Sequence, residues 1–280
     1  MKYIFYTLLF LTVSCKKTPT NNAKMVLVDT IQKNRINNNI EPINNKSKIT
    51  NLQKGLTNND LCFVNNFYSK IDNSSNTNEQ EFCLKSIINL TLISKKEFQG
   101  LLNSKSNLYI SNRTKYSKND TILELKTKNG SIKLIDKPDN EESMIINNYV
   151  GEVKFLNIYL ISRNFWEDTD YIYLDKETGK MTNQFIDYPY ISPNKNYIIS
   201  LYSNGYEKSG DLTLHKITNK NTLELELTAS FSRWMPALEP QECFWITDKQ
   251  FVVKVLPSKS FWKKNGSYND NFQYLKISIL

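Results

Sequence analysis

Short runs of alternating apolar and polar residues, separated by turn residues, fill the second part of the chain and constrain its fold most strongly. The clearest stretch is Thr121–Ile135, TILELKTKNGSIKLI, in which an Asn-Gly pair separates two alternating runs. Asn-Gly tolerates the positive φ angles of a tight hairpin turn, so this stretch predicts two antiparallel strands. Asp170–Phe185 repeats the plan with Gly179 at its turn. We therefore expect a mainly β body of antiparallel sheets over residues 107–280.

The preceding residues, 58–106, show a different pattern. Apolar side chains recur there at spacings of three and four, which is typical of amphipathic helices. Ser94 lies three residues before Glu97, the spacing of a capping box at a helix start. The expected helices lie near 60–71, 79–91 and 94–102. Together with the sheets they would form a single globular domain, 58–280, which is long enough for one substantial core.

The turns of the β-rich part recur at intervals of roughly 40 to 50 residues, the size of a four-stranded propeller blade. Tyr188–Leu201, YPYISPNKNYIISL, resembles the Ser-Pro-Asp-Gly-Lys stretch of WD40 or TolB-like blades. Ser192 and Pro193 match that stretch, and Asn194–Asn196 replace Asp-Gly-Lys. The resemblance implies a propeller-like fold of three to five blades. A single antiparallel meander or a sandwich is the alternative.

The first residues, 1–14, have the layout of a secretory signal peptide. Lys2 gives a positive start, an apolar run follows, and Ser14 is a small residue at the end. A membrane-spanning helix needs about 20 apolar residues, and this run has about half of that number. We therefore expect residues 1–14 to be removed from the mature protein.

Cys15 follows this segment directly, and the junction resembles the lipobox of bacterial lipoproteins. Leu11, Ser14 and Cys15 match the pattern, while Thr12, where Leu is usual, resembles the looser form common in Bacteroidetes. The resemblance implies cleavage before Cys15 and attachment of acyl chains to it. Several chains on one residue anchor a protein durably. The resemblance also implies an outer-membrane lipoprotein that faces the periplasm, with surface exposure as the alternative.

Residues 15–57 combine many asparagines with few large apolar side chains. Such a composition cannot bury enough surface to offset chain entropy, so we expect a disordered tether. The segment from Lys16 to Thr57 contains eight basic residues and only two acidic ones, so it holds most of the formal net charge of +8. A nucleic-acid-binding domain concentrates Lys and Arg on its own surface. We therefore expect a membrane partner through the lipid anchor and no nucleic acid.

Three cysteines remain after Cys15, namely Cys62, Cys83 and Cys243. An exported protein folds in an oxidising compartment that permits disulfides. Cys62 and Cys83 both belong to the expected helical start, so their pairing is the favoured one, and three reduced thiols are the alternative. Cys243, beside Phe244, is expected to be a buried apolar residue.

The sequence holds none of the common catalytic motifs of hydrolases, kinases or zinc enzymes. His215 is the only histidine, which excludes a multi-histidine zinc site, and it lies on the polar side of an expected strand. Acidic residues gather at 139–142 and 167–170, in expected loops where water solvates their charge. We therefore expect no catalytic residue, no metal and no cofactor.

Aromatic residues form the remaining candidate site. Large rings in the connections between strands could make a stacking platform for a sugar or a peptide, because they offer wide contact area at little entropic cost. The expected platform consists mainly of Arg233, Trp234, Trp166 and Tyr190, and Phe231, Met235 and Tyr188 are its further members. The alternative is that these rings fill the space between sheets.

These observations favour a non-enzymatic binding module of the cell envelope, held by a lipid and directed at an envelope protein or a glycan. One alternative is a glycoside hydrolase on a propeller-like scaffold, which would place two carboxylates in one cleft. Another is an immunity or inhibitor lipoprotein, which would expose a large apolar or acidic patch.

Overall fold

The computed structural model describes residues 55–70, 73–77, 80–81, 84–111, 116–139, 143–219, 222–237, 243–267 and 269–280. All of them belong to one unit, Asn51–Leu280. The expected signal peptide, 1–14, and nearly all of the expected tether, 15–57, lie outside the described residues. The described part is mainly β and is built of antiparallel sheets, which confirms the predicted fold class.

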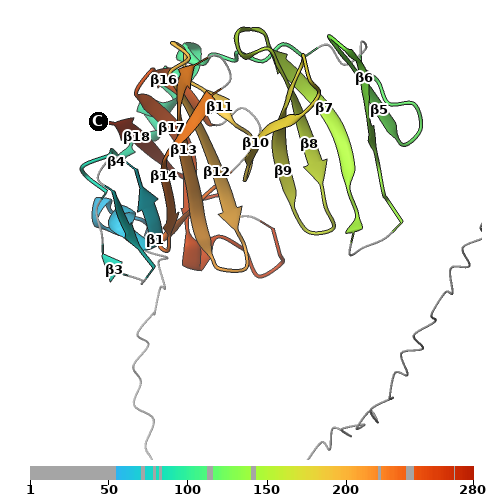
Figure 1. Ribbon diagram of the computed structural model, residues 1–280. Helices are drawn as coiled ribbons and strands as arrows, with labels where there is room; N and C mark the ends of the chain where they lie inside the picture. Colours follow the sequence, from blue (N-terminus) through green and yellow to red (C-terminus); the bar gives the residue numbers. More distant parts are fainter. Residues whose placement is uncertain are drawn as a thin grey trace, which may run out of the picture. The chain divides into compact units, whose positions relative to one another are not determined.

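Two of the four sheets come from the predicted hairpins (Figure 1). The first sheet is a hairpin of β5 (Ile122–Thr127) and β6 (Gly130–Ile135), and Gly130 has the positive φ, 134°, that the Asn-Gly pair predicts. The second sheet is a four-stranded meander. Its strands are β7 (Ile146–Val153), β8 (Ile158–Asn164), β9 (Thr169–Asp175) and β10 (Met181–Phe185).

The other two sheets combine strands from both ends of the unit. The strands of the third are β11 (Tyr190–Ile191), β12 (Tyr197–Asn204), β13 (Ser209–Asn219), β14 (Thr222–Phe231), β1 (Phe63–Ser69), β2 (Ser74–Asn76) and β3 (Gln80–Glu81). The strands of the fourth are β15 (Trp234–Pro236), β16 (Cys243–Thr247), β17 (Gln250–Pro257), β18 (Gln273–Ile279) and β4 (Ile88–Ile93). The last strand of the chain, β18, therefore lies between β17 and the early strand β4, with Ile279 opposite Ile88.

The hydrophobic cores lie between successive sheets. Side chains alternate across a strand, so a strand in the middle of such a stack is apolar on both faces. On β8, Ile158 packs in a cluster with Ile198 of the third sheet, whereas Tyr159 packs with Leu123 of the first. Another cluster joins the third sheet to the fourth. The second and third sheets are therefore covered on both sides.

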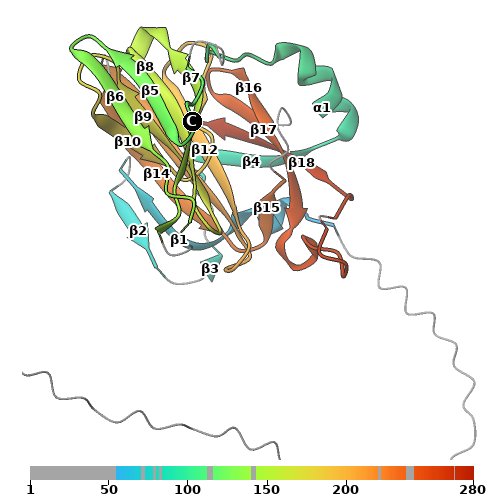
Figure 2. The same ribbon diagram turned by 90° about the vertical axis from the view of Figure 1, so that its right-hand side faces the viewer.

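One of the three expected helices is confirmed. α1 (Lys95–Leu101) begins where predicted, and the Ser94 hydroxyl accepts a hydrogen bond of 3.1 Å from the Glu97 N–H. Phe98 packs it against the fourth sheet, and Figure 2 shows α1 beside that sheet. Further helical pieces among the described residues are 3-10 turns, which include η1 (Asn58–Cys62), η2 (Leu102–Ser104), η4 (Lys154–Leu156) and η5 (Ser258–Ser260).

The expected helix near 60–71 is wrong, because most of this stretch is strand β1. A β-bulge explains the misleading spacing. The pairing with β14 shifts register between Val64 and Asn66, and the extra residue turns both Val64 and Phe67, three positions apart, into the same core. A three-residue spacing therefore arose here from a bulged strand.

The expected helix near 79–91 is also wrong in its described part. Its last residues belong to β4, which is held by pairing with β18 almost 200 residues later. The spacing of apolar residues within this stretch does not indicate a strand partner so far along the chain. The cysteine of this stretch, Cys83, lies outside the described residues.

The segment that resembles a propeller blade forms a tight turn between β11 and β12. The Ser192 hydroxyl accepts hydrogen bonds from the N–H groups of Asn196 and Tyr197, at 3.1 and 3.0 Å. Lys195 occupies the Gly position of the blade pattern and adopts a left-handed φ of 63°. The resemblance to a propeller blade and a propeller-like arrangement of the sheets stay predictions.

Candidate ligand pocket

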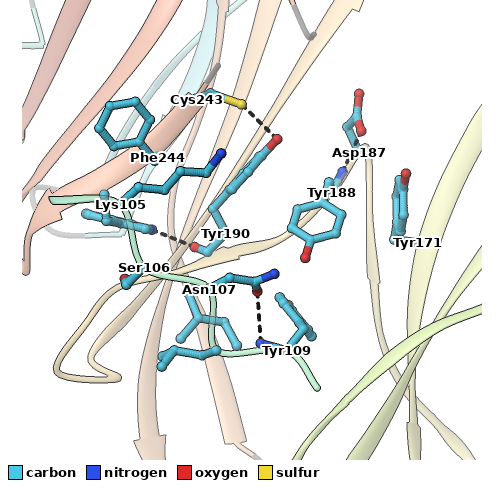
Figure 3. Close-up of a pocket in the computed structure, with 13 residues that line it drawn as sticks. Lys105, Ser106, Asn107, Tyr109, Tyr171, Asp187, Tyr188, Tyr190, Cys243 and Phe244 are labelled. Atoms are coloured by element: carbon cyan, nitrogen blue, oxygen red, sulfur yellow. Dashed lines mark hydrogen bonds between the residues drawn. The ribbon is translucent and has the colours of Figure 1, made fainter. Parts of the chain in front are cut away.

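A cavity of ≈ 310 Å³ is lined by residues of the second, third and fourth sheets and by the segment 105–109 (Figure 3). Its aromatic lining consists of Tyr109, Tyr171, Tyr188, Tyr190, Phe244 and Trp245. Lys105 and Asp187 are its charged residues within the described lining. Pockets for small molecules commonly start near 300 Å³ and combine apolar walls with a few polar groups. This cavity has both properties.

Tyr188 is the centre of the aromatic lining. Its ring centroid lies 4.8 Å from that of Tyr190, 5.3 Å from that of Tyr109 and 5.6 Å from that of Tyr171. Tilted and edge-on contacts at these distances are favourable because the positive edge of one ring meets the negative face of the next. The four tyrosines, from three separate parts of the chain, therefore form one connected group, which we call the tyrosine cluster.

Hydrogen bonds fix the position of Tyr109 in the tyrosine cluster. Its hydroxyl donates to the carbonyl of Pro189 at 2.6 Å, so the hydroxyl of Tyr173, also at 2.6 Å, donates to Tyr109. Burial raises the pKa of both hydroxyls above the ordinary tyrosine value, which keeps both protonated as donors. Tyr109 is thereby tied to β9 of the second sheet and to the residue directly before β11 of the third.

The fourth sheet contacts the cluster through Tyr190. The indole N–H of Trp245 donates to the Tyr190 carbonyl at 2.8 Å, and the Cys243 thiol donates to the Tyr190 hydroxyl at 2.7 Å. Cys243 is buried, as predicted, and it stays outside any disulfide. A pocket whose walls are fixed in this way loses little conformational entropy when a ligand binds.

Asp187 supplies the acidic group of the pocket. Burial raises the pKa of Asp187 to about 6, the hydrogen bond from the Tyr188 N–H at 2.5 Å opposes the rise, and the nearby charge of Asp168 adds to it. The Ser200 hydroxyl of β12 binds the Asp187 backbone on both sides, accepting from its N–H at 3.1 Å and donating to its carbonyl at 2.6 Å. The carboxylate is thus held in place and carries its charge at neutral pH.

Of the four main residues of the expected platform, Tyr190 lines the pocket and the other three do not. Tyr188, a further member of that platform, also lines the pocket. Trp234 is fully buried and stacks on Phe231, with ring centroids 4.6 Å apart. The Arg233 guanidinium lies 3.4 Å from the ring centroid of Phe63. Trp166 is 58% exposed in the connection between β8 and β9. These four residues therefore do not form one platform around the pocket.

Asp187, Tyr109 and Tyr171 were not predicted as site residues from the sequence. A usable signal was present in the run Asp187–Tyr190, DYPY, where a carboxylate and two rings flank a proline directly after a strand. No comparable local signal marks Tyr109, because its role depends on contact with Tyr173 and Pro189, which are 64 and 80 positions away.

Cys62 takes part in a disulfide bond. Cys15 and Cys83 lie outside the described residues, so the pairing of Cys62 with Cys83 and the lipidation of Cys15 stay predictions. Within the described ranges, no helix is long and apolar enough to cross a membrane. The described residues also contain no group of His, Cys, Asp and Glu arranged to hold a metal ion.

His215 lies on β13, and the second sheet covers the face that carries it. Its ring centroid is 5.4 Å from that of Phe185, and its buried Nδ1 has no hydrogen-bond partner in the described structure. Burial lowers the pKa of His215 to about 4. The expected strand-surface position is therefore a half-buried one between sheets.

Comparison of the chain with protein-family models, with curated proteins and with solved structures gave no match. The pocket must therefore be interpreted from its own chemistry.

Proposed function

We propose that the protein is a lipid-anchored, non-enzymatic binding module of the bacterial cell envelope, and that its pocket binds a glycan. The observation that carries the ligand class is the tyrosine cluster around a fixed cavity. A tyrosine offers an apolar ring to the C–H face of a sugar and a hydroxyl to its polar edge. The lipid anchor rests on the resemblance of Leu11, Ser14 and Cys15 to a lipobox.

The number of acidic side chains in the pocket favours a binding function over glycoside hydrolysis. Hydrolysis of a glycosidic bond generally uses two carboxylates that flank the bond. Asp187 is the one carboxylate within the described lining. A fixed aromatic surface with a single acid supports recognition of a sugar.

The test is retention of the full chain on an array of bacterial envelope oligosaccharides, followed by titration calorimetry with the sugars retained. Tyr188→Ala removes the central ring and should weaken binding at least tenfold, whereas Tyr188→Phe should keep part of the affinity. Tyr206→Ala, at a tyrosine that is 76% exposed and outside the pocket lining, is the control and should bind as the wild type does.

Two results would overturn the proposal. One is the absence of retention on every sugar, and the other is an equal loss of binding in Tyr188→Ala and Tyr206→Ala. Release of shorter sugars during the titration, seen by chromatography, would favour the hydrolase instead.

A further inference from the structure

We propose that the sugar bound in this pocket carries a protonated amino group, which is held against the carboxylate of Asp187. The inference deepens the glycan-binding function proposed above and rests on it. It concerns the side of the pocket formed by Asp187, Tyr171 and Tyr188 (Figure 3).

The carboxylate of Asp187 has no ion-pair partner among the described residues. Some other shielded carboxylates in the described structure do have one. Asp170 pairs with Arg163, and Glu152 pairs with Lys176 at 2.7 Å. A half-buried charge without a counter-ion is costly, so Asp187 is suited to receive a cation from outside the chain.

The groups near Asp187 add to the negative potential. A second carboxylate, Asp168, acts on it through its negative charge and accepts a hydrogen bond from the Tyr202 hydroxyl. The protein's own ammonium group in the pocket, that of Lys105, lies across the cavity from Asp187 in Figure 3. A cationic ligand group would therefore be attracted to the Asp187 side.

The rings beside Asp187 favour the same charge. Tyr171 and Tyr188 are in contact with each other, and both line the pocket next to the carboxylate. The face of an aromatic ring is negative and attracts ammonium groups, and the attraction grows when water is excluded. A carboxylate flanked by two rings is thus complementary to an amine attached to an apolar sugar ring.

The carboxylate is also positioned before a ligand arrives. Ser200 holds the backbone of Asp187 through two hydrogen bonds, and the Tyr188 N–H holds its side chain. A charge that is already in place contributes more to selectivity than one that must be ordered on binding.

The test compares two sugars that differ only in the amine. The full chain is titrated at pH 7 with glucosamine oligomers, whose amines are free, and with N-acetylglucosamine oligomers of the same length. We expect the free-amine oligomers to bind at least tenfold more tightly. Asp187→Asn should abolish this preference, so that the variant binds the two kinds of oligomer with affinities within about twofold of each other.

Asp270→Asn is the matched control, because it makes the same chemical change at a carboxylate that is 74% exposed and outside the pocket lining. It should keep the preference. Circular dichroism checks the fold of both variants. Should Asp187→Asn fail to fold, the comparison of the two sugars on the wild type still decides the question.

Equal affinity for the two sugars, or a preference that survives in Asp187→Asn, would overturn the inference while leaving glycan binding intact. If neither oligomer binds and the array retains other sugars that lack amines, the inference also falls alone. If no sugar binds at all, both proposals fall.

Discussion

Among single residues, Asp187 is a proposed binding group whose ionised carboxylate lowers the free energy of unfolding. Its pKa is raised from 3.8 to about 6 in the folded protein, because burial disfavours the charged form. The folded state therefore holds the Asp187 proton more tightly than the unfolded state does. Stability rises as the pH falls from about 6 to below 4, and the ionised carboxylate is destabilising above pH 6.

Asp187→Asn should therefore increase the free energy of unfolding at pH 7.5 by roughly 1 to 3 kcal/mol, since one pKa unit corresponds to about 1.4 kcal/mol. The Asn side-chain oxygen can still accept from the Tyr188 N–H. The gain should vanish near pH 3.5, where Asp187 is protonated. Urea unfolding at both pH values measures the effect, and a variant less stable than the wild type at pH 7.5 would contradict it.

His215 has the opposite effect on stability. Its pKa is lowered from 6.5 to about 4 by burial, so the unfolded state takes up the proton first. The wild type should lose roughly 2 to 3 kcal/mol through this group as the pH falls from 6.5 to 4. The His215→Leu variant should not show this loss of unfolding free energy between pH 6.5 and pH 4. The difference between the variant and the wild type measures the contribution of His215 alone, because the opposing effect of Asp187 is present in both.

The measurement for His215 is direct, because the chain has only one histidine. The imidazole proton resonances of the folded protein should titrate with a midpoint near pH 4. A midpoint close to 6.5 would show that the ring is solvated and would remove the physical basis of the prediction.

At the scale of elements, the turn between β9 and β10 shows why a glycine is needed. Gly179 has a φ of 72°, and a Cβ there would lie 2.3 Å from Cγ2 of Ile132 in the first sheet. Asp175 closes the turn by accepting from the Thr178 N–H at 2.7 Å. The turn of the meander thus packs so closely against the hairpin that position 179 has no room for a side chain.

Gly179→Ala should therefore lower the free energy of unfolding by about 1 to 3 kcal/mol, from backbone strain and the contact with Ile132. Gly205→Ala is the control, because Gly205 lacks a positive φ and has nothing within 4 Å of an added Cβ. It should stay within about 1 kcal/mol of the wild type. Thermal unfolding compares the two, and equal stabilities would contradict the prediction.

For the whole molecule, the main prediction concerns the anchor. Cells fed labelled palmitate should incorporate the label into the wild type, and Cys15→Ala should lose both the label and membrane association. Acyl chains contribute about 0.8 kcal/mol per buried methylene, so their loss should release the protein. Cys243→Ser is the matched cysteine control and should remain labelled. Unchanged labelling of Cys15→Ala would contradict the lipoprotein assignment.

Elements with local signals were predictable from the sequence. The Asn-Gly hairpin, the Gly179 turn and the Ser94 helix start all depend on residues within a few positions of one another. β1 was mistaken for a helix because its bulge imitates a helical spacing, and only the pairing with β14 reveals it. Of the expected platform, Tyr190 and Tyr188 line the pocket within the described residues.

The sequence by itself determined that this protein is built of antiparallel strands, because alternation and turn residues act over a few positions of the chain. The tertiary structure alone decided where the pocket lies. Tyr109, Tyr188 and Trp245 come from three distant segments, and their contacts form only when the sheets stack. The raised pKa of Asp187 has the same origin, since burial is a property of the packed molecule.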